Sequence, residues 1–366
     1  MKIGILKEIE KNEKRVSISP KIAKQLIEKG FEVVVEDDAG SSSKYKNSDY
    51  EEVGVQVEKR GAVYKECDIL VKINPFDEDG LKLIDDHHIL ICQLFHKSNP
   101  EIVKQIAEKG ATVFSMDALP RISRAQDMDV LSSQSNLAGY KAVIKGAYEM
   151  TKIFPLMMTA AGTITPSRVL IYGVGVAGLQ AIATAKRLGA VVEATDIRLE
   201  TKEQAESLGA KFITVDPNGE ASENGYAKAA SEDYARRQKE AVNNSLFKAD
   251  LVITTAMVPG RKSPILITEE QVKQMKNGAV IIDLAAAQGG NCELSKMNKT
   301  VIKNGVKIIG TTISPESVST NASDLYGKNM FNFINYLTEN NEFKWNLEDQ
   351  ITDETLIVKD GVIRKT

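Results

Sequence analysis

One stretch of the chain, residues 168–196, constrains the fold more than any other. A short apolar run at residues 168–172 leads into three glycines at G-x-G-x-x-G spacing, and a second apolar run at 191–195 ends in an acid. Residues 179–188 between them are predicted to form a helix. This order of strand, glycine turn, helix and strand favours a dinucleotide-binding unit over the alternative, a glycine-containing turn in an ordinary α/β core. The motif residues are Gly173, Gly175, Gly178 and Asp196.

Each of these residue types has a physical task in binding a dinucleotide. Gly173 permits the tight turn, Gly175 lets the pyrophosphate approach the backbone, and Gly178 lets the helix pack closely on the strand. The free N–H groups and positive dipole at the helix N-terminus favour the phosphates. Asp196 is placed to accept hydrogen bonds from both ribose hydroxyls, which predicts NAD(H) rather than NADP(H). Arg198 leaves the alternative open, because a nearby arginine can accommodate a 2′-phosphate.

The remainder of the chain continues the alternation of strands and helices, which predicts an α/β fold with mostly parallel sheets. At 366 residues the chain is long enough for two domains. We predict two Rossmann-like domains, the first lacking a phosphate-binding glycine motif. The predicted N-terminal domain comprises residues 1–132 and 318–366, and the predicted NAD(H)-binding domain comprises 133–317, including a connecting helix at 133–150.

The predicted elements follow from short apolar runs and from helix-capping pairs. Residues 154–162 are predicted to be either a second bridging segment or a core segment, and residues 331–337 a helix. Residues 349–364 resemble a terminal hairpin with Asp360-Gly361 as its turn. The other predicted strands are 3–6, 31–35, 69–71, 89–94, 112–115, 211–215, 251–255 and 279–283, and the other predicted helices are 20–28 and 100–109 (capped by Ser19 and Asn99), 202–208 and 268–275.

Two further segments of the second half are candidates for ligand contact. The strand at 251–255 leads into Ala256, and ligands of open α/β sheets lie at the carboxyl ends of strands, so we predict that Ala256 contacts the cofactor. Residues 217–234 are polar and contain Tyr226. A loop of that length inside a domain is typical of a lid, a binding loop or a flexible insertion, and the sequence leaves these alternatives open.

Composition excludes several classes of function. Hydrophobic residues make up 42% and charged residues 27%, and the net charge of −3 provides no basic surface for nucleic acid or anionic membranes. No apolar run approaches the roughly 18 residues of a membrane span, and the start resembles a strand rather than a signal peptide. We therefore expect a cytoplasmic protein. The three cysteines lack metal-ligand spacing, so we expect reduced core residues and no metal site (Cys67, Cys92 and Cys292).

A second polar constellation lies at residues 120–136, between an apolar strand and an apolar helix. It could be a solvated linker with helix caps. Alternatively, its side chains could converge on a carboxamide and its ribose, and we expect Asn136 at its end to contact the cofactor as well. The four residues that carry this second interpretation are Arg121, Gln126, Asp129 and Ser132.

The motifs of this constellation resemble the NAD(H)-binding alpha subunit, or domain I, of proton-translocating NAD(P) transhydrogenase. The sequences Arg-Ile-Ser-Arg-Ala-Gln from residue 121 and Met-Asp-Val-Leu-Ser-Ser-Gln-Ser-Asn-Leu-Ala-Gly-Tyr from residue 128 carry the resemblance, which extends over essentially the whole chain. It implies NAD(H) bound in a cleft between the domains, NADP(H) bound on a partner subunit, and direct hydride transfer between them. It also implies membrane-spanning partner subunits, a peripheral location at the inner membrane and a homodimer.

The same resemblance implies residue roles. Arg121, Gln126, Asp129 and Ser132 would hold the nicotinamide end, as the residues nearest the reaction. Tyr226 would belong to a mobile loop that closes on the nucleotide. The pyrophosphate and adenosine-ribose contacts would be Gly175, Val176, Ala177, Asp196 and Ile197.

A related family, alanine dehydrogenase, provides the main alternative function. Arg15, Lys72 and His96 stand where that family holds a 2-oxo acid and donates a proton, although each could be structural. Ala287 departs from both families, since alanine dehydrogenases carry an aspartate and transhydrogenases commonly a glutamate there. Carbonyl reduction needs a positioned acid, whereas hydride exchange between nicotinamides needs apposition and exclusion of water. The sequence therefore favours transhydrogenation, with a non-catalytic NAD-binding regulator as a third class.

Overall fold

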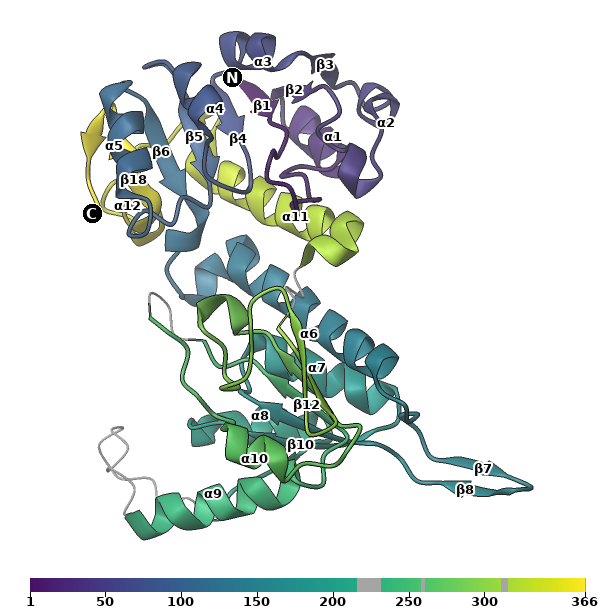
Figure 1. The fold of residues 1–366 in the computed structure, drawn as a ribbon. Coiled ribbons are helices and arrows are strands. Elements are labelled where there is room, and N and C mark those ends of the chain that lie inside the picture. Colours follow the sequence, from purple (N-terminus) through teal and green to yellow (C-terminus); the bar gives the residue numbers. More distant parts are fainter. Residues whose placement is uncertain (216–231, 258–260, 311–314, 366) are drawn as a thin grey trace. The chain divides into compact units, whose positions relative to one another are not determined.

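The computed structural model describes residues 1–215, 232–257, 261–310 and 315–365. The chain forms two compact units, Met1–Gln134 with Pro315–Thr366, and Ser135–Ser314. Each unit is a doubly wound α/β domain, which confirms the predicted fold class (Figure 1).

The first unit is built on an eight-stranded sheet whose order is β19-β18-β6-β5-β4-β1-β2-β3. Strands β1 to β6 are parallel in the Rossmann order 3-2-1-4-5-6, and β18 and β19 add an antiparallel edge. The strands are β1 (Lys2–Ile5), β2 (Glu32–Glu36), β3 (Gln56–Glu58), β4 (Ile69–Val71), β5 (Ile89–Cys92), β6 (Thr112–Ser115), β18 (Leu356–Lys359) and β19 (Val362–Ile363). The helices are α1 (Pro20–Glu28), α2 (Asn47–Glu51), α3 (Arg60–Glu66), α4 (Glu78–Lys82), α5 (Pro100–Glu108), α11 (Ser319–Leu337) and α12 (Gln350–Thr355), with a short 3₁₀ turn η3 (Ser123–Met128) and a small hairpin of β16 (Thr338–Glu339) and β17 (Glu342–Phe343).

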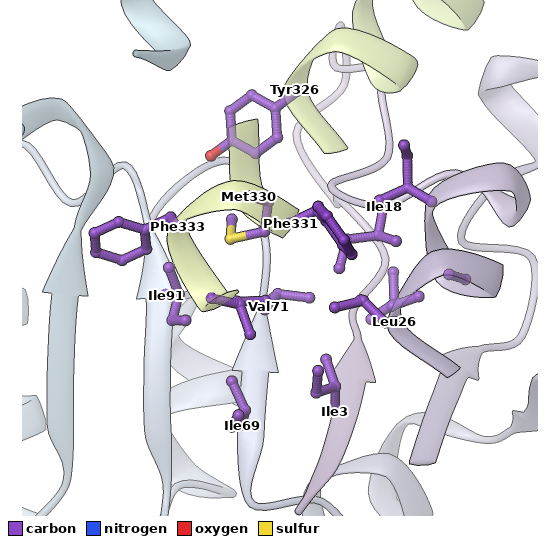
Figure 2. Close-up of a cluster of buried hydrophobic side chains, with 14 of the residues drawn as sticks. Ile3, Ile18, Leu26, Ile69, Val71, Ile91, Tyr326, Met330, Phe331 and Phe333 are labelled. Carbon is purple, nitrogen blue, oxygen red and sulfur yellow. The ribbon is translucent and has the colours of Figure 1, made fainter. Parts of the chain in front are cut away.

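Alternation along the strands creates a core on each face of this sheet. In β4, Ile69 and Val71 face α1 and α11, whereas Leu70 faces α3 and α5. Figure 2 shows how the side chains of α11, among them Met330 and Phe333, cover the strands. The helix from the C-terminal part of the chain thus completes the N-terminal domain.

The second unit is built on a seven-stranded sheet whose order is β11-β10-β9-β12-β13-β15-β14. Its first six strands are parallel and again follow the order 3-2-1-4-5-6, while β14 is antiparallel at the edge. The strands are β9 (Arg168–Tyr172), β10 (Val191–Thr195), β11 (Lys211–Phe212), β12 (Leu251–Thr254), β13 (Val280–Asp283), β14 (Thr300–Lys303) and β15 (Val306–Ile309). The helices are α7 (Val176–Arg187), α8 (Lys202–Ser207), α9 (Glu232–Leu246) and α10 (Glu269–Lys273), together with α6 (Val130–Glu149), which starts in the first unit and continues into the second.

Residues 154–162 contradict both alternatives predicted for them. They contribute to a two-stranded hairpin of β7 (Met157–Thr159) and β8 (Gly162–Ile164), whose six residues are all exposed. Figure 1 shows the hairpin extending away from the seven-stranded sheet. The prediction was wrong because an apolar sequence does not by itself determine whether a segment is buried.

Several other element predictions require correction. Helix α11 begins twelve residues before the predicted helix at 331, and residues 350–355 form α12 instead of part of a hairpin. The hairpin itself, with its turn at Asp360-Gly361, is confirmed for β18 and β19. Ser19 and Asn99 precede their helices as predicted, but neither side chain caps, because Ser19 Oγ donates to Asp324 and Asn99 Nδ2 donates to backbone carbonyls.

Within the parts of the chain that the structure describes, no helix has the length and apolar character needed to cross a membrane. Among those same residues there is no group of three or more histidine, cysteine or acidic side chains arranged to hold a metal ion. All three cysteines are buried without disulfides, and burial raises the pKa of each thiol.

Candidate functional site

The three glycines of the fingerprint lie at the turn from β9 into α7. Gly173 has a φ of +94°, a conformation that favours glycine, and a Cβ at that position would lie 2.5 Å from Thr255 Oγ1. A Cβ on Gly178 would lie 1.9 Å from the Gly173 carbonyl oxygen. The helix can therefore approach the turn this closely only if residue 178 has no side chain.

Gly175 differs from the other two glycines, because its absent side chain faces open space. No atom lies within 4 Å of a Cβ built there, and its φ of −87° is ordinary for any residue. Gly175 precedes α7, so the space it leaves lies beside the free N–H groups at that helix's N-terminus. An anion placed there would meet these donors and the positive end of the helix dipole. Val176 is partly exposed in the first turn, while Ala177 is buried.

Asp196 follows β10 and is joined to the glycine turn. Its Oδ2 accepts the Val174 N–H at 2.7 Å, and its two oxygens accept Nε and Nη2 of Arg198, each at 3.0 Å. Burial raises the pKa of the Asp196 carboxyl, but the hydrogen bonds from Arg198 and Val174 outweigh it and lower the pKa overall. The carboxylate is thus ionised and oriented, with Arg198 as its present partner. Ile197 beside it is 97% exposed.

The segment predicted to hold a nicotinamide is anchored in the first unit. Two of its residues, Ala125 and Met128, are buried, and the Asp127 carbonyl accepts hydrogen bonds from Asn329 and Asn332 of α11. Gln126 and Arg121 are exposed, and within the described chain neither side chain has a hydrogen-bond or ion-pair partner. A rigid backbone therefore presents two unpaired polar side chains.

Asp129 and Ser132 are paired with each other at the start of α6. Asp129 Oδ1 accepts the Ser132 N–H at 2.9 Å, and Oδ2 accepts the Ser132 hydroxyl at 2.6 Å. The first of these bonds is the usual bond of a helix N-cap. Asp129 thus has the capping role that was left open, and it also fixes the orientation of the Ser132 hydroxyl. Asn136, one turn further along α6, is exposed.

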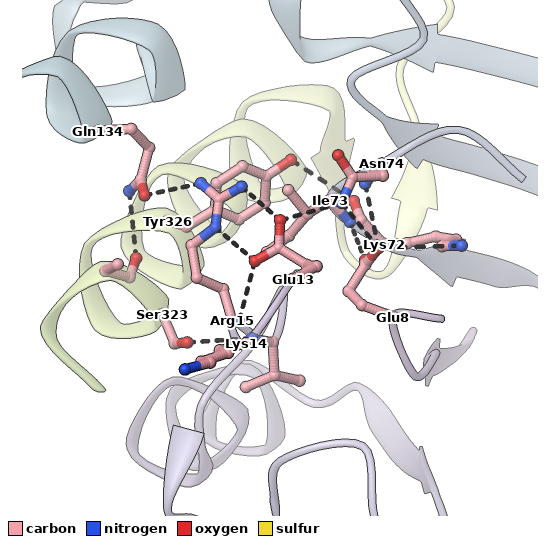
Figure 3. Close-up of polar contacts among 12 residues, drawn as sticks. Glu8, Glu13, Lys14, Arg15, Lys72, Ile73, Asn74, Gln134, Ser323 and Tyr326 are labelled. Atoms are coloured by element: carbon pink, nitrogen blue, oxygen red, sulfur yellow. Dashed lines mark hydrogen bonds and ion pairs between the residues drawn. The ribbon is translucent and has the colours of Figure 1, made fainter. Parts of the chain in front are cut away.

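In the first unit, charged side chains of the protein itself lie at the carboxyl ends of the central strands, the place where the second unit has its glycine turn. A buried network lies at the carboxyl ends of β1 and β4, the point where the strand order reverses and where ligands of doubly wound sheets bind. In Figure 3, Glu13 bridges Arg15 and Asn74, while Glu8 contacts Lys72 and Asn74. The sequence reasoning identified the two cations here but missed the two glutamates.

These contacts pair Arg15 with Glu13 and place Lys72 Nζ 3.9 Å from Glu8, whose pKa is raised by burial. Arg15 is 8% exposed and is held by Glu13 on two of its nitrogens, with Gln134 on the third, while Lys72 is 2% exposed. Burial raises the pKa of Glu13, but the hydrogen bonds from Arg15 outweigh it and lower the pKa overall. A 2-oxo acid carboxylate would have to displace an ionised, hydrogen-bonded glutamate to reach Arg15.

Three further positions were named from the sequence, His96, Ala287 and Tyr226. Burial lowers the pKa of His96, which disfavours the protonated form that would act as a proton donor. Ala287 is exposed after β13 and offers no polar group. Tyr226 lies outside the described residues.

Comparison with known proteins identifies relatives along the whole chain. The model for the alanine dehydrogenase/PNT N-terminal domain matches residues 4–138, and the model for the C-terminal domain matches residues 142–366. The first part of NAD(P) transhydrogenase subunit alpha of Rhodospirillum rubrum is 48% identical, covering 99% of this chain and 97% of that protein. Among solved structures, the transhydrogenase from Sinorhizobium meliloti has a TM-score of 0.90 at 40% identity, covering 99% of this chain and 100% of the other. An L-alanine dehydrogenase has a TM-score of 0.82 at 25% identity, covering 99% and 96%.

Proposed function

The chain belongs to the alanine dehydrogenase/PNT family, and we propose that it is the NAD(H)-binding component of a proton-translocating NAD(P) transhydrogenase. The observation that carries this proposal is the near end-to-end similarity to the Rhodospirillum rubrum transhydrogenase alpha chain, at 48% identity. The pairing of Arg15 with the ionised Glu13 supports it against the dehydrogenase alternative.

The residues of the second unit fit a dinucleotide. The open space beside Gly175 would receive the pyrophosphate, where the first N–H groups of α7 donate. Asp196 would accept the ribose hydroxyls after exchanging part of its contact with Arg198. Ile197, at 97% exposure, would lie against the adenosine half. We propose Gly173, Val176, Ala177 and Ala256 as further backbone contacts.

Bound NADH supplies the hydride, and the chain's task is to orient the nicotinamide for direct transfer to NADP⁺ held by a partner. Transfer between two nicotinamide carbons would exchange no proton there, so the chain would not need to supply an acid or a base at the reacting atoms. In this proposal Arg121 and Gln126 orient the carboxamide and ribose, and Ser132, fixed by Asp129, offers an acceptor. The protein contributes apposition and exclusion of water, consistent with a site poor in acids.

The partners in this proposal are an NADP(H)-binding subunit and membrane-spanning subunits. The Rhodospirillum rubrum relative is named as only the first part of an alpha subunit, which supports the view that further chains complete the enzyme. The protein would then lie at the cytoplasmic face of the inner membrane through those subunits.

The test is to measure NADH binding, followed by hydride transfer to an NADP⁺ analogue with and without an NADP-binding partner domain. We expect transfer only with the partner. Two control reactions distinguish the alternatives. Turnover of NADH with pyruvate and ammonia in the usual enzyme range of ~1–10³ s⁻¹ would establish an amino-acid dehydrogenase. NADH binding without transfer to any acceptor would establish a regulator.

Nucleotide choice is expected to depend on Asp196. Its ionised carboxylate should repel a 2′-phosphate, so NADH should bind more tightly than NADPH in fluorescence titrations. Asp196→Ala would release Arg198 to meet the 2′-phosphate, and we expect the preference to shift toward NADPH by about tenfold, or about 1.4 kcal/mol. Arg198→Ala serves as the control and should preserve the NADH preference. Equal affinities of the wild-type protein for both nucleotides would contradict this assignment.

We also propose a homodimer in which the hairpin of β7 and β8 contacts a second copy. Leu156, Met157, Met158 and Ile164 are 43–77% exposed, and residues 153–167 contain no charged side chain. A two-stranded hairpin is marginal in water by itself, and an exposed apolar edge invites pairing with another chain. These properties support the proposal that a second copy of the chain covers the hairpin in solution.

Substitution on the hairpin tests the homodimer. Met158→Asp places a charge on the most exposed of its apolar residues, at 77%, and should shift light scattering from dimer to monomer at micromolar concentration. Met297→Asp, at a methionine 55% exposed elsewhere in the same unit, should leave the dimer intact. A dimer that persists in Met158→Asp would exclude the hairpin as the contact.

A further inference from the structure

The end of β12 is tied to three neighbouring elements by three consecutive residues. Thr254 Oγ1 donates to Asp283 Oδ1 at the end of β13, at 3.0 Å. Thr255 Oγ1 donates to the carbonyl of Gly173, also at 3.0 Å. Ala256 is held through its backbone by Asn291, which accepts its N–H at 3.0 Å and donates to its carbonyl at 2.8 Å. The position of Ala256 is therefore set by one side chain outside the glycine fingerprint.

Asn291 is fully buried, and the oxygen and both N–H groups of its side-chain amide make hydrogen bonds. Besides its two bonds to Ala256, Nδ2 donates to the Pro264 carbonyl at 2.8 Å. Its own backbone is fixed by Asp283, whose Oδ2 accepts the N–H groups of Asn291 and Cys292 at 2.8 and 3.0 Å. Asp283 is 2% exposed, so it holds the Asn291 backbone in a fixed position. We call the hydrogen bonds of the Asn291 side chain to Ala256 and Pro264 the Asn291 clamp. Only a side chain with one acceptor and two donors can make these three bonds.

These hydrogen bonds lie close to the point where the strand order of the second sheet reverses. Strand β12 lies next to β9 on the side away from β10, so Gly173 and Ala256 border the point where the strand order reverses. A dinucleotide spans that point. Its adenosine half lies toward β10 and Asp196, so its other half extends toward the ends of β12 and β13.

We propose that Asn291 is a positioning residue that holds Ala256 in place for the nicotinamide half of NAD(H), an inference that rests on the proposed function. Asn291 itself does not touch the nucleotide, because it is buried beneath the Ala256 backbone. Asp283 acts indirectly, because it fixes the backbone of Asn291. The adenosine half depends on Asp196 and the N-terminus of α7, neither of which Asn291 contacts.

The experiment compares two probes in one variant. Asn291→Asp keeps the shape but replaces two donors by acceptors, so it should displace Ala256 from its carbonyl contact. By calorimetry we expect NADH affinity to fall about tenfold or more, as for the loss of one hydrogen bond of about 1.4 kcal/mol. The affinity for 5′-AMP, which probes only the adenosine half, should change less than about twofold. Should the buried charge prevent folding, Asn291→Ser provides a smaller, neutral substitution with the same expected pattern.

Asp250→Ala provides the matched control. Asp250 lies at the opposite end of β12, because it precedes that strand and accepts the N–H of Arg168 at the start of the neighbouring β9 at 2.8 Å. This variant should melt at a lower temperature while its ratio of NADH to AMP affinity stays at the wild-type value. Equal losses of NADH and AMP in Asn291→Ser would show that Asn291 only stabilises the domain, and no loss of either would also overturn the inference. Failure of the wild-type protein to bind NADH would instead refute the proposed function.

Discussion

Replacing Gly175 by alanine is expected to weaken NADH binding strongly while leaving the melting temperature of the protein unchanged. The added methyl group meets no atom within 4 Å, and the φ of −87° suits alanine, so the folded state accommodates it. The methyl would occupy the space in which a pyrophosphate approaches the backbone. We expect NADH affinity to fall by about 10²-fold, equivalent to about 2.7 kcal/mol. Fluorescence titration and thermal melting of the same preparation measure the two quantities.

Gly178→Ala is the matched comparison, because the same methyl group has the opposite effect on folding. There it would lie 1.9 Å from the Gly173 carbonyl oxygen, and backbone cannot rotate aside as a side chain can. We expect a marked fall in melting temperature, in the range of the 1–3 kcal/mol or more that overpacking costs. If Gly175→Ala bound NADH as tightly as the wild-type protein, the turn between β9 and α7 would not be the pyrophosphate site.

The central part of the fold could be predicted because short-range patterns determine it. Apolar runs of three to five residues defined β4, β6, β9 and β10 with the bounds that the structure shows. Strand β14 and its partner β15 were missed, although Asn304-Gly305 between them is a strong hairpin signal. The start of α11 was missed because residues 319–330 carry many small and polar side chains, and their helical state depends on packing against the N-terminal domain.

The candidate site was predictable only where local sequence carries its geometry. The glycines and Asp196 lie together because one βαβ unit brings them together, and the hydrogen bond from Val174 to Asp196 joins its two ends. The clamp from Asn291 to Ala256 spans 35 residues and has no local pattern. The buried pairing of Arg15 with Glu13 was equally hidden, because only the structure shows that both side chains turn inward.

Gln126→Asn is expected to slow hydride transfer about 10²-fold with little change in stability. The substitution keeps the amide but withdraws it by one methylene, and a misplacement of about 1 Å can cost that much in rate. The exposed Gln126 side chain lies on a backbone fixed through Ala125, Met128 and the Asp127 carbonyl, so nothing else in the segment needs to move. An exposed polar change usually alters stability by less than about 0.5 kcal/mol.

In Gln126→Asn, NADH affinity and the rate of hydride transfer should change by different amounts. NADH affinity should fall less than the rate, since the contacts of Asp196 and the N-terminus of α7 remain. Single-turnover transfer in the complex with an NADP-binding partner, together with NADH titration and thermal melting, measures the three effects. Gln105→Asn makes the same chemical change at an exposed position of α5 and should leave the rate unaltered. A Gln126→Asn protein that melts early yet transfers hydride normally would mean that residues 121–132 are structural, and the nicotinamide would then have to be oriented from the second unit alone.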